Sequence, residues 1–239
     1  MLKYQIADVI FSVLPIYKYT VGFLKDYAYS GDKAPEFSVS VTDNDIQYEK
    51  ELSGEDYPLA IFETLAILRK FCEYMVANAN GFIFHSSAIM VDGKAYLFTA
   101  PSGTGKSTHA RLWCEMLKSK AVMINDDKPI VRLIDGKYYA FGTPWQGKHG
   151  LGANVRAEVK AICKISQSTT NRIKKISVGE AFDTVLNQTL RPSDERVMNK
   201  LLNGVEGLLK SCDLYALECD ISRQACELSY GVMAKGELC

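Results

Sequence analysis

Ala100-Pro101-Ser102-Gly103-Thr104-Gly105-Lys106-Ser107-Thr108 is the stretch of this chain that decides the fold. An apolar, aromatic run over 95–99 precedes it and predicts a buried strand, and apolar residues at helical spacing follow it over 110–117. In a glycine-rich loop between a strand and a helix, successive N–H groups and the helix N-terminus hold phosphate oxygens. The lysine reaches the outer phosphates, and the next hydroxyl can ligate Mg²⁺. The sequence therefore predicts that residues 100–108 bind a nucleoside triphosphate.

One position departs from the usual pattern of such loops. The pattern begins with glycine where this chain has Ala100, but alanine is also small, and Gly103 and Gly105 are kept. An ordinary glycine-rich turn between a strand and a helix is the alternative reading of the same residues.

Length and composition limit the class of protein. The 239 residues suffice for one large domain, or for one domain with a small appendage. Lys plus Arg and Asp plus Glu both number 28, so bulk charge does not indicate nucleic acid or a membrane surface as a partner. Seven cysteines without a Cys-x-x-Cys pair predict reduced thiols and a cytoplasmic protein. We expect it to be soluble, because it lacks a signal-peptide layout and any apolar run near ~20 residues.

The chain is expected to divide at about residue 80. Residues 1 to about 56 are expected to be β-rich, with extended runs over 36–42 and 46–52 on either side of a turn at Asp43-Asn44-Asp45. Pro58 is tolerated in a first helical turn, and a helix is predicted over 59–76. Residues 1–80 are thus a small β-rich segment plus a helix, and residues 81–239 are the domain that carries the predicted phosphate loop.

Two hairpins are predicted around this loop. Asp92-Gly93 and Asp135-Gly136 each lie between apolar runs, which is a strong hairpin signal. We therefore expect an α/β fold with a mixed sheet rather than a purely parallel one. A further strand is predicted at 121–125. The last third of the chain predicts helices over 179–190, 194–211 and 222–235 and a strand over 214–219.

Two carboxylates, Asp126 and Asp127, follow the apolar run 121–125. In nucleotide enzymes an acid at such a strand end holds Mg²⁺, and in kinases an acid can accept the proton of the attacking hydroxyl. Neighbouring residues of a strand point to opposite faces, so one carboxylate is expected to meet metal and the other substrate. The sequence leaves open which has which role, and a solvated turn is the alternative.

His85 and a second glycine-rich stretch are further candidates. His85 ends the apolar run 81–84, in a strand expected to pair antiparallel with the one that feeds the phosphate loop, so it could lie near the loop's mouth. A structural histidine is the alternative, and a hydrogen bond to an aspartate would favour function. The stretch 142–154 is either a lid over the site or a flexible surface loop. Beyond it, Arg156, Glu158 and Lys160 share one face of a predicted strand, for which a solvated face is the default.

The order of these motifs resembles the catalytic domain of bacterial HPr kinase/phosphorylase, which is related to phosphoenolpyruvate carboxykinases. The similarity covers roughly residues 81–165 and includes Glu158-Val159-Lys160-Ala161-Ile162. It implies an HPr-kinase-like or carboxykinase-like fold, with residues 81–239 as a P-loop kinase catalytic domain. It also implies site residues: Mg²⁺ ligands Ser107 and Glu158, and catalytic residues His85, Lys106, Asp127 and, for a late family arginine, Arg191. Asp127 then takes the proton of the acceptor serine, which leaves Asp126 for the metal.

Departures from the family bear on the substrate. The family usually has Lys-Ser-Glu where this chain has Lys106-Ser107-Thr108, and His-Gly where it has His85-Ser86. The roughly 80 residues before the catalytic domain are also fewer than the family's recognition domain. These differences argue against HPr as the substrate and make the chain more similar to shorter HPr-kinase-like proteins, some of which phosphorylate peptides.

The expected function is ATP- and Mg²⁺-dependent transfer of the γ-phosphate to a hydroxyl, that of a serine in a peptide or protein. A small-metabolite kinase or carboxykinase-like enzyme is one alternative, and a nucleotide-binding regulator without catalysis is another. A guanine-specific switch is disfavoured, because the sequence has no Asn-Lys-x-Asp. Neither nucleic acid nor a membrane is expected as a partner, and the sequence leaves open whether the chain forms a homo-oligomer.

Overall fold

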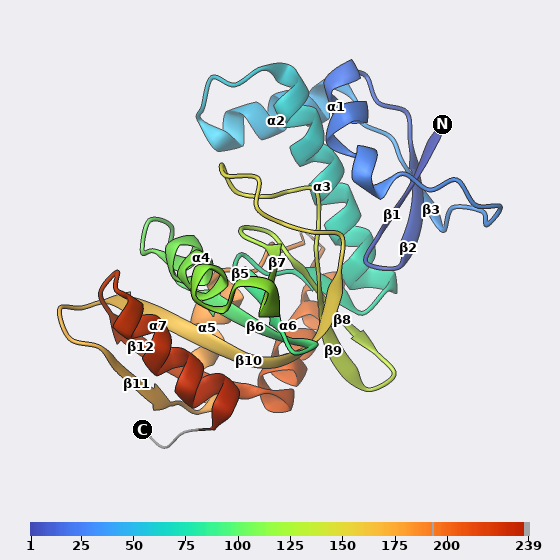
Figure 1. Cartoon of the computed structure of the whole chain (residues 1–239). Coiled ribbons are helices and arrows are strands. Elements are labelled where there is room, and N and C mark those ends of the chain that lie inside the picture. The colour runs from blue at the N-terminus through green and yellow to red at the C-terminus, as the bar shows by residue number, and fades with distance from the viewer. Residues whose placement is uncertain (193, 237–239) are drawn as a thin grey trace.

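The computed structural model describes residues 1–192 and 194–236. A nine-stranded mixed sheet forms its centre, and a three-stranded sheet lies in the N-terminal segment (Figure 1). In the large sheet the order is β4-β8-β9-β10-β6-β5-β7, with β12 beside β10 and β11 beside β12. β10 is parallel to both β6 and β12, and the other pairs in this sheet are antiparallel. The expected α/β class with a mixed sheet is thus confirmed.

The strands have the following bounds: β1 Leu2–Ile6, β2 Val9–Val13, β3 Phe37–Val39, β4 Gly81–Ile83, β5 Ser87–Val91, β6 Lys94–Thr99, β7 Ala121–Asn125, β8 Ile130–Ile134, β9 Lys137–Phe141, β10 Arg156–Gln167, β11 Arg172–Lys175 and β12 Asp213–Cys219. Both predicted Asp-Gly hairpins are present, as β5–β6 and β8–β9.

The helices are α1 Lys18–Phe23, α2 Asp43–Ser53, α3 Leu59–Asn78, α4 Lys106–Leu117, α5 Val178–Asn187, α6 Glu195–Ser211 and α7 Arg223–Tyr230. Short 3₁₀ turns occupy Lys25–Tyr27 and Lys118–Lys120, and a π-helical turn, Gly231–Lys235, continues α7. Within residues 1–192 and 194–236, no helix combines the length and the apolar character that crossing a bilayer requires.

Two expectations about pairing and local structure were wrong. The run 46–52 is part of helix α2 rather than a strand, because Thr42 and Asp45 form a capping box at the start of that helix. The run 81–84 is not the antiparallel partner of β6. β4 pairs with β8, and β5 pairs with β6. His85 therefore lies on the segment that crosses between β4 and β5.

The large sheet is covered on both faces. Along β6, Tyr96 and Phe98 belong to a hydrophobic cluster with α4 and α7, whereas Ala95 and Leu97 belong to a second cluster with α3, α5 and α6. Within the first cluster, α4 and α7 lie side by side (Figure 1). Trp113 Nε1 donates to Ser229 Oγ, and His109 Nε2 shares a hydrogen bond with the same oxygen, both at 2.9 Å.

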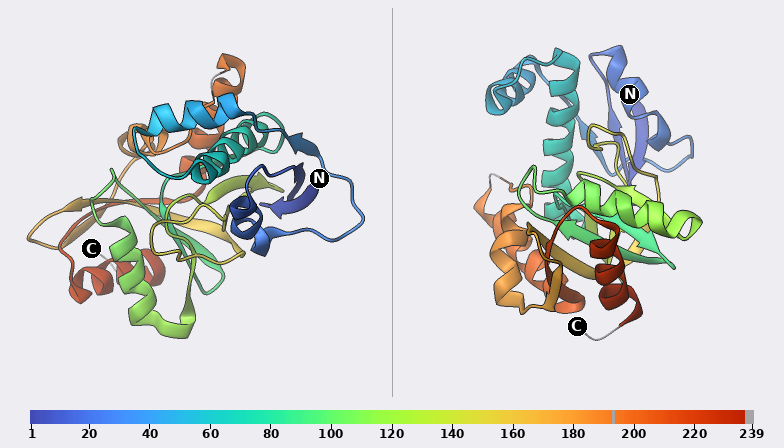
Figure 2. Two further views of the ribbon diagram at one scale, coloured as in Figure 1. Left: turned by 90° about the horizontal axis from the view of Figure 1, so that it is seen from above. Right: turned by 60° about the vertical axis from the view of Figure 1, so that its left-hand side comes forward.

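The N-terminal segment packs against the second of these clusters. Ile6 and Phe11 from its small sheet are buried in the same cluster as Phe82 and Ile124 of the large sheet. Strand β1 and the π-helical turn Gly231–Lys235 lie on opposite sides of the molecule (Figure 2). A division into domains at residue 80 stays a prediction.

Candidate active site

The predicted phosphate loop lies between the end of β6 and the start of α4. Gly103 and Gly105 have φ of +79° and +112°, values that favour glycine. A Cβ at either position would meet no atom within 4 Å, so this side of the loop is open. Ala100, in contrast, is fully buried, and the alanine that replaces the usual glycine packs into the core. The local geometry fits a loop whose outer side receives a ligand.

Lys106 is folded back on this loop. Its Nζ donates hydrogen bonds to the carbonyl oxygens of Ala100 at 2.9 Å and Pro101 at 3.4 Å. Burial lowers the pKa of Lys106, and the nearby Asp127 carboxylate opposes that effect. The Lys106 ammonium group is thus held by two loop carbonyl oxygens, and the charge of Asp127 acts on it.

Asp126 lies directly behind the loop. The Ser107 hydroxyl donates to its carbonyl oxygen at 3.1 Å, and Ser87 Oγ lies 3.0 Å from the same oxygen. The Asp126 side chain is buried, its Oδ1 accepts from Gly147 N at 2.7 Å, and its Oδ2 has no hydrogen-bond partner among the described residues. Burial raises the pKa of this carboxyl, although the Gly147 hydrogen bond lowers it. A buried carboxylate oxygen without a partner requires a proton or a cation.

These residues fit an Mg²⁺ site of the kind that forms together with a nucleotide. Mg²⁺ prefers oxygen ligands and in such sites takes one or two from the protein, with phosphate and water supplying the others. Ser107 has a hydroxyl that contacts the main-chain carbonyl of Asp126, and the Asp126 side chain has a carboxylate oxygen without a partner among the described residues. In the described part of the chain, no three His, Cys, Asp or Glu side chains gather into a site that could hold a metal alone.

Asp127 and His85 are in direct contact. His85 Nε2 donates to Asp127 Oδ1 at 2.9 Å, and Lys128 Nζ is paired with Asp127 Oδ2. Burial would raise the pKa of Asp127, but the His85 hydrogen bond and the Lys128 charge outweigh it and lower the pKa to about 2. The backbone supports this arrangement, since Ser86 N donates to the Asp127 carbonyl at 3.1 Å. The structure thus brings together the histidine and the second aspartate that the sequence had proposed as partners.

Asn125 is a site residue that the sequence did not single out. Its Oδ1 accepts from the backbone N–H groups of Asp127 at 2.8 Å and Lys128 at 2.7 Å. Its Nδ2 donates toward Thr143 O and Oγ1 and toward Trp145 O, at 3.1, 3.0 and 3.3 Å. An asparagine that binds the backbone two residues on is a recognisable turn signal. Asn125 therefore fixes both the turn that carries Asp127 and the position of the 142–154 loop.

The 142–154 loop is anchored at its start and exposed at its tip. Thr143 and Trp145 are buried, and Trp145 Nε1 donates to the Thr64 carbonyl of α3 at 2.9 Å. Figure 1 shows this yellow loop rising beside α3. Lys148 and His149 are exposed. The sequence left open a lid or a flexible surface loop; the first half of the loop is anchored, and a lid formed by its exposed tip stays a prediction.

Glu158 lies at the opposite end of β6 from the phosphate loop, so the expectation that it joins Ser107 at one metal needs correction. In the parallel register Glu158 is opposite Lys94, whereas the loop follows Thr99. The five residue-to-residue steps from Lys94 to Thr99 span about 16 Å of strand. The Glu158 carboxylate is bound by Lys94 Nζ at 2.7 Å and lies 3.5 Å from Lys137 Nζ.

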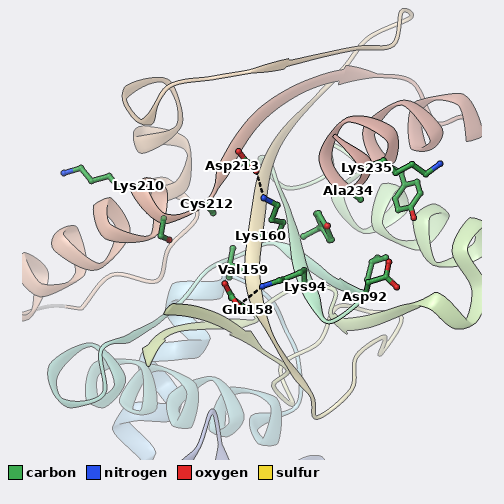
Figure 3. Close-up of a pocket in the computed structure, with 14 residues that line it drawn as sticks. Asp92, Lys94, Glu158, Val159, Lys160, Lys210, Cys212, Asp213, Ala234 and Lys235 are labelled. Carbon is green, nitrogen blue, oxygen red and sulfur yellow. Dashed lines mark hydrogen bonds and ion pairs between the residues drawn. The ribbon is translucent and has the colours of Figure 1, made fainter. Parts of the chain in front are cut away.

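Figure 3 shows the surroundings of Glu158, a cavity of about 770 Å³ at this opposite edge of the sheet. Two ion pairs, of Lys94 with Glu158 at 2.7 Å and of Lys160 with Asp213 at 2.9 Å, lie among the residues that line it. These paired charges connect the starts of β6, β10 and β12, and residues 100–108 take no part in the lining.

Arg191 is not brought to Asp127 either. The segment before it runs antiparallel to 83–85, with His85 N donating to Gln188 O at 2.6 Å and Leu190 N donating to Ile83 O at 3.1 Å. Gln188 is thus the residue beside His85, and Arg191 lies three residues further along. The exposed Arg191 guanidinium instead donates to Asn187 Oδ1 at 2.5 Å.

Comparison with known proteins finds a structural similarity but no sequence match. No family model and no curated protein matches the sequence. Among solved structures, the chain is similar to the HPr(Ser) kinase/phosphatase from Coxiella burnetii, with a TM-score of 0.31 and 12% identity over 54% of this chain and 88% of that chain. This similarity is a weak structural link, and it does not establish the family or the activity of this chain.

Proposed function

We propose that this chain is an ATP- and Mg²⁺-dependent phosphotransferase that moves the γ-phosphoryl group to a hydroxyl, that of a serine in a peptide or protein. The observation that supports this most strongly is the contact of the Asp127 carboxylate with His85 Nε2 at 2.9 Å, at the end of β7 and near Ser107 of the loop. A carboxylate that can accept the acceptor's proton, together with a phosphate-binding lysine, is what hydroxyl phosphorylation needs.

The phosphates would be held by the chain's own donors. The open side of residues 101–105 offers backbone N–H groups, and Lys106 exchanges its two carbonyl acceptors for outer phosphate oxygens. Ser107 and the unpartnered oxygen of Asp126 would hold Mg²⁺, which neutralises phosphate charge when bound. Glu158 and Arg191 have no role in this proposal.

Asp127 would act on the acceptor. The acceptor oxygen forms a bond to the γ-phosphorus while the bond from that phosphorus to the β,γ-bridging oxygen breaks, and ADP leaves with the electron pair. The acceptor proton passes to Asp127, whose oxygens keep a further lone pair beside their contacts to His85 and Lys128. A low pKa suits a carboxylate that orients the hydroxyl and takes its proton late, as the loose transition state of phosphoryl transfer allows.

The test compares the wild-type protein with the Asp127→Asn variant, using γ-labelled ATP and a panel of serine peptides and small hydroxylated metabolites. Removing the base should lower the rate of phosphoryl transfer about 10²–10⁴-fold, while the affinity for ATP stays close to the wild-type value. Asp135→Asn is the matched control, because Asp135 lies in the exposed β8–β9 turn.

Three results of this experiment would change the proposal. Undiminished transfer by Asp127→Asn with intact ATP binding would remove Asp127 from the mechanism. Labelling of a metabolite but of no peptide would make the chain a small-molecule kinase. Tight ATP binding by the wild-type protein without any labelled product would identify a nucleotide-binding regulator.

A further inference from the structure

The strand order places different strands on the two sides of the phosphate loop. On one side of β6 lie β5 and β7, and the end of β7 carries Asp126 and Asp127. On the other side lie β10 and β12, both running in the same direction as β6. A triphosphate on the loop must turn its terminal phosphate toward the two aspartates, if the proposed function is correct. Its nucleoside then leaves the loop on the β10 and β12 side.

The ends of β10 and β12 reach the loop at that side. Lys164 of β10 is opposite Thr99, so β10 continues three residues past β6 to Gln167, which is opposite Cys219 at the end of β12. Gln167 Nε2 donates to the Thr104 carbonyl of the phosphate loop at 3.3 Å. The turn after Cys219 is therefore next to the place where a nucleoside would emerge.

Ile221 occupies this turn with its side chain in solvent. It is 72% exposed, more than any other large hydrophobic side chain that the structure describes. The turn itself is well fixed, because Asp220 N donates to Asn171 Oδ1 at 3.0 Å and Ser222 caps α7 by accepting from Ala225 N at 3.2 Å. An aliphatic side chain held in this way offers a preformed apolar surface, whose covering by a ligand is favourable.

A small pocket lies between Ile221 and the loop. Thr104, Thr108 and Leu112 line it on the side of the loop and α4, and Gln167 and Ile221 line it on the other side. It encloses only about 20 Å³, so an aromatic ring would lie across its rim and not inside it. We propose that this rim is the base site, where the adenine of ATP rests on Ile221 while residues 100–108 hold the phosphates. This inference rests on the proposed function.

The experiment measures the affinities for ATP and for inorganic tripolyphosphate, both with Mg²⁺, by titration calorimetry. Ile221→Ser should weaken ATP binding at least about fivefold and leave tripolyphosphate binding unchanged, because only ATP has a base. Ile221→Leu should keep the wild-type ATP affinity. Ile16→Ser, which changes an isoleucine that is 48% exposed in the N-terminal segment, should alter neither affinity.

The outcomes separate this inference from the proposed function. Unchanged ATP affinity in Ile221→Ser, or equal losses for ATP and tripolyphosphate, would overturn the base site even if the wild-type protein transfers phosphate. A selective loss of ATP affinity in a protein that phosphorylates no acceptor would support the base site and contradict the phosphotransferase. A wild-type protein that binds neither ligand would contradict both.

Discussion

Among single residues, Asp127 has an ionisation that links the candidate site to stability. Its pKa is about 2 in the folded protein, because His85 and Lys128 outweigh the opposing effect of burial. A carboxyl whose pKa falls on folding stabilises the protein above its unfolded pKa, and this contribution is lost as the pH falls through the folded value. For Asp127 it amounts to about 2 kcal/mol at neutral pH.

We therefore predict a specific difference between wild-type protein and Asp127→Asn in acid. Between about pH 4 and pH 2 the unfolding free energy of the wild-type protein should fall by about 2 kcal/mol more than that of the variant. Denaturant titrations monitored by circular dichroism across this range measure the difference. Parallel pH curves for the two proteins would show that Asp127 is not held ionised by its partners.

Asn125 offers a second prediction at this scale, because it binds both the Asp127 turn and the 142–154 loop. Asn125→Asp replaces an amide donor by a carboxylate oxygen that faces Thr143 O and Oγ1 and Trp145 O. This should cost about 1–3 kcal/mol of stability. If Asp127 is displaced, phosphotransfer turnover should also fall at least about tenfold with little change in ATP affinity.

A matched control separates positioning from general destabilisation. Ser229 is equally buried and binds His109 and Trp113, on elements that do not carry Asp127. Ser229→Ala should lower the unfolding free energy without lowering turnover at a temperature where the protein stays folded. If both variants lose turnover in proportion to stability, Asn125 has only a structural role.

Among the elements, the 142–154 loop has the closest contact with the candidate metal ligand. A Cβ on Gly147 would lie 3.0 Å from Asp126 Oδ2, the oxygen without a partner. Gly147→Ala should therefore displace either the loop or the carboxylate and raise the Mg²⁺ concentration needed for half-maximal transfer, by about tenfold. A magnesium titration of the transfer rate measures this change.

Gly179→Ala is the control for that substitution. Gly179 lies in the first turn of α5, where a Cβ would meet no atom within 4 Å, so its replacement should leave the magnesium requirement unchanged. A normal magnesium requirement in Gly147→Ala would argue that Asp126 does not hold the metal.

The elements also show which features a sequence can reveal. Hairpins at Asp92-Gly93 and Asp135-Gly136 were predictable because the turn residues and the apolar runs are neighbours in sequence. The capping box of α2 was also local, and Thr42 and Asp45 could have corrected the predicted strand. The separation of β4 from β5 depends on pairing with β8, far along the chain, which no local pattern contains.

In the candidate site, too, the features set by neighbouring residues were predictable and those set by distant contacts were not. The loop 100–108 and the two aspartates each follow a strand directly, so the sequence predicted which elements they join. Glu158 was misplaced because its position depends on the direction of β10, which runs parallel to β6 and so starts at the edge away from the loop. The role of Asn125 depends on Thr143 and Trp145, which reach it only through the anchored loop.

At the scale of the whole molecule, the N-terminal segment and the large sheet share a core. Trp145 connects them, because its ring contacts Phe23 and Phe71 while its backbone carbonyl accepts from Asn125. The other tryptophan, Trp113, lies in the separate cluster between the sheet, α4 and α7. The two tryptophans therefore report on different parts of the structure.

This arrangement predicts that the chain unfolds as one cooperative unit, because both clusters pack on opposite faces of the same strands. Trp113→Phe leaves Trp145 as the only fluorescent indole, and Trp145→Phe leaves Trp113. In each variant the fluorescence transition in urea should coincide with the transition of its own far-ultraviolet circular dichroism.

An earlier fluorescence transition in Trp113→Phe would mean that the contact around Trp145 opens first. The N-terminal segment would then be an independent unit, and a variant of the shared core in that segment, such as Phe11→Ala, should leave the Trp113 transition unchanged.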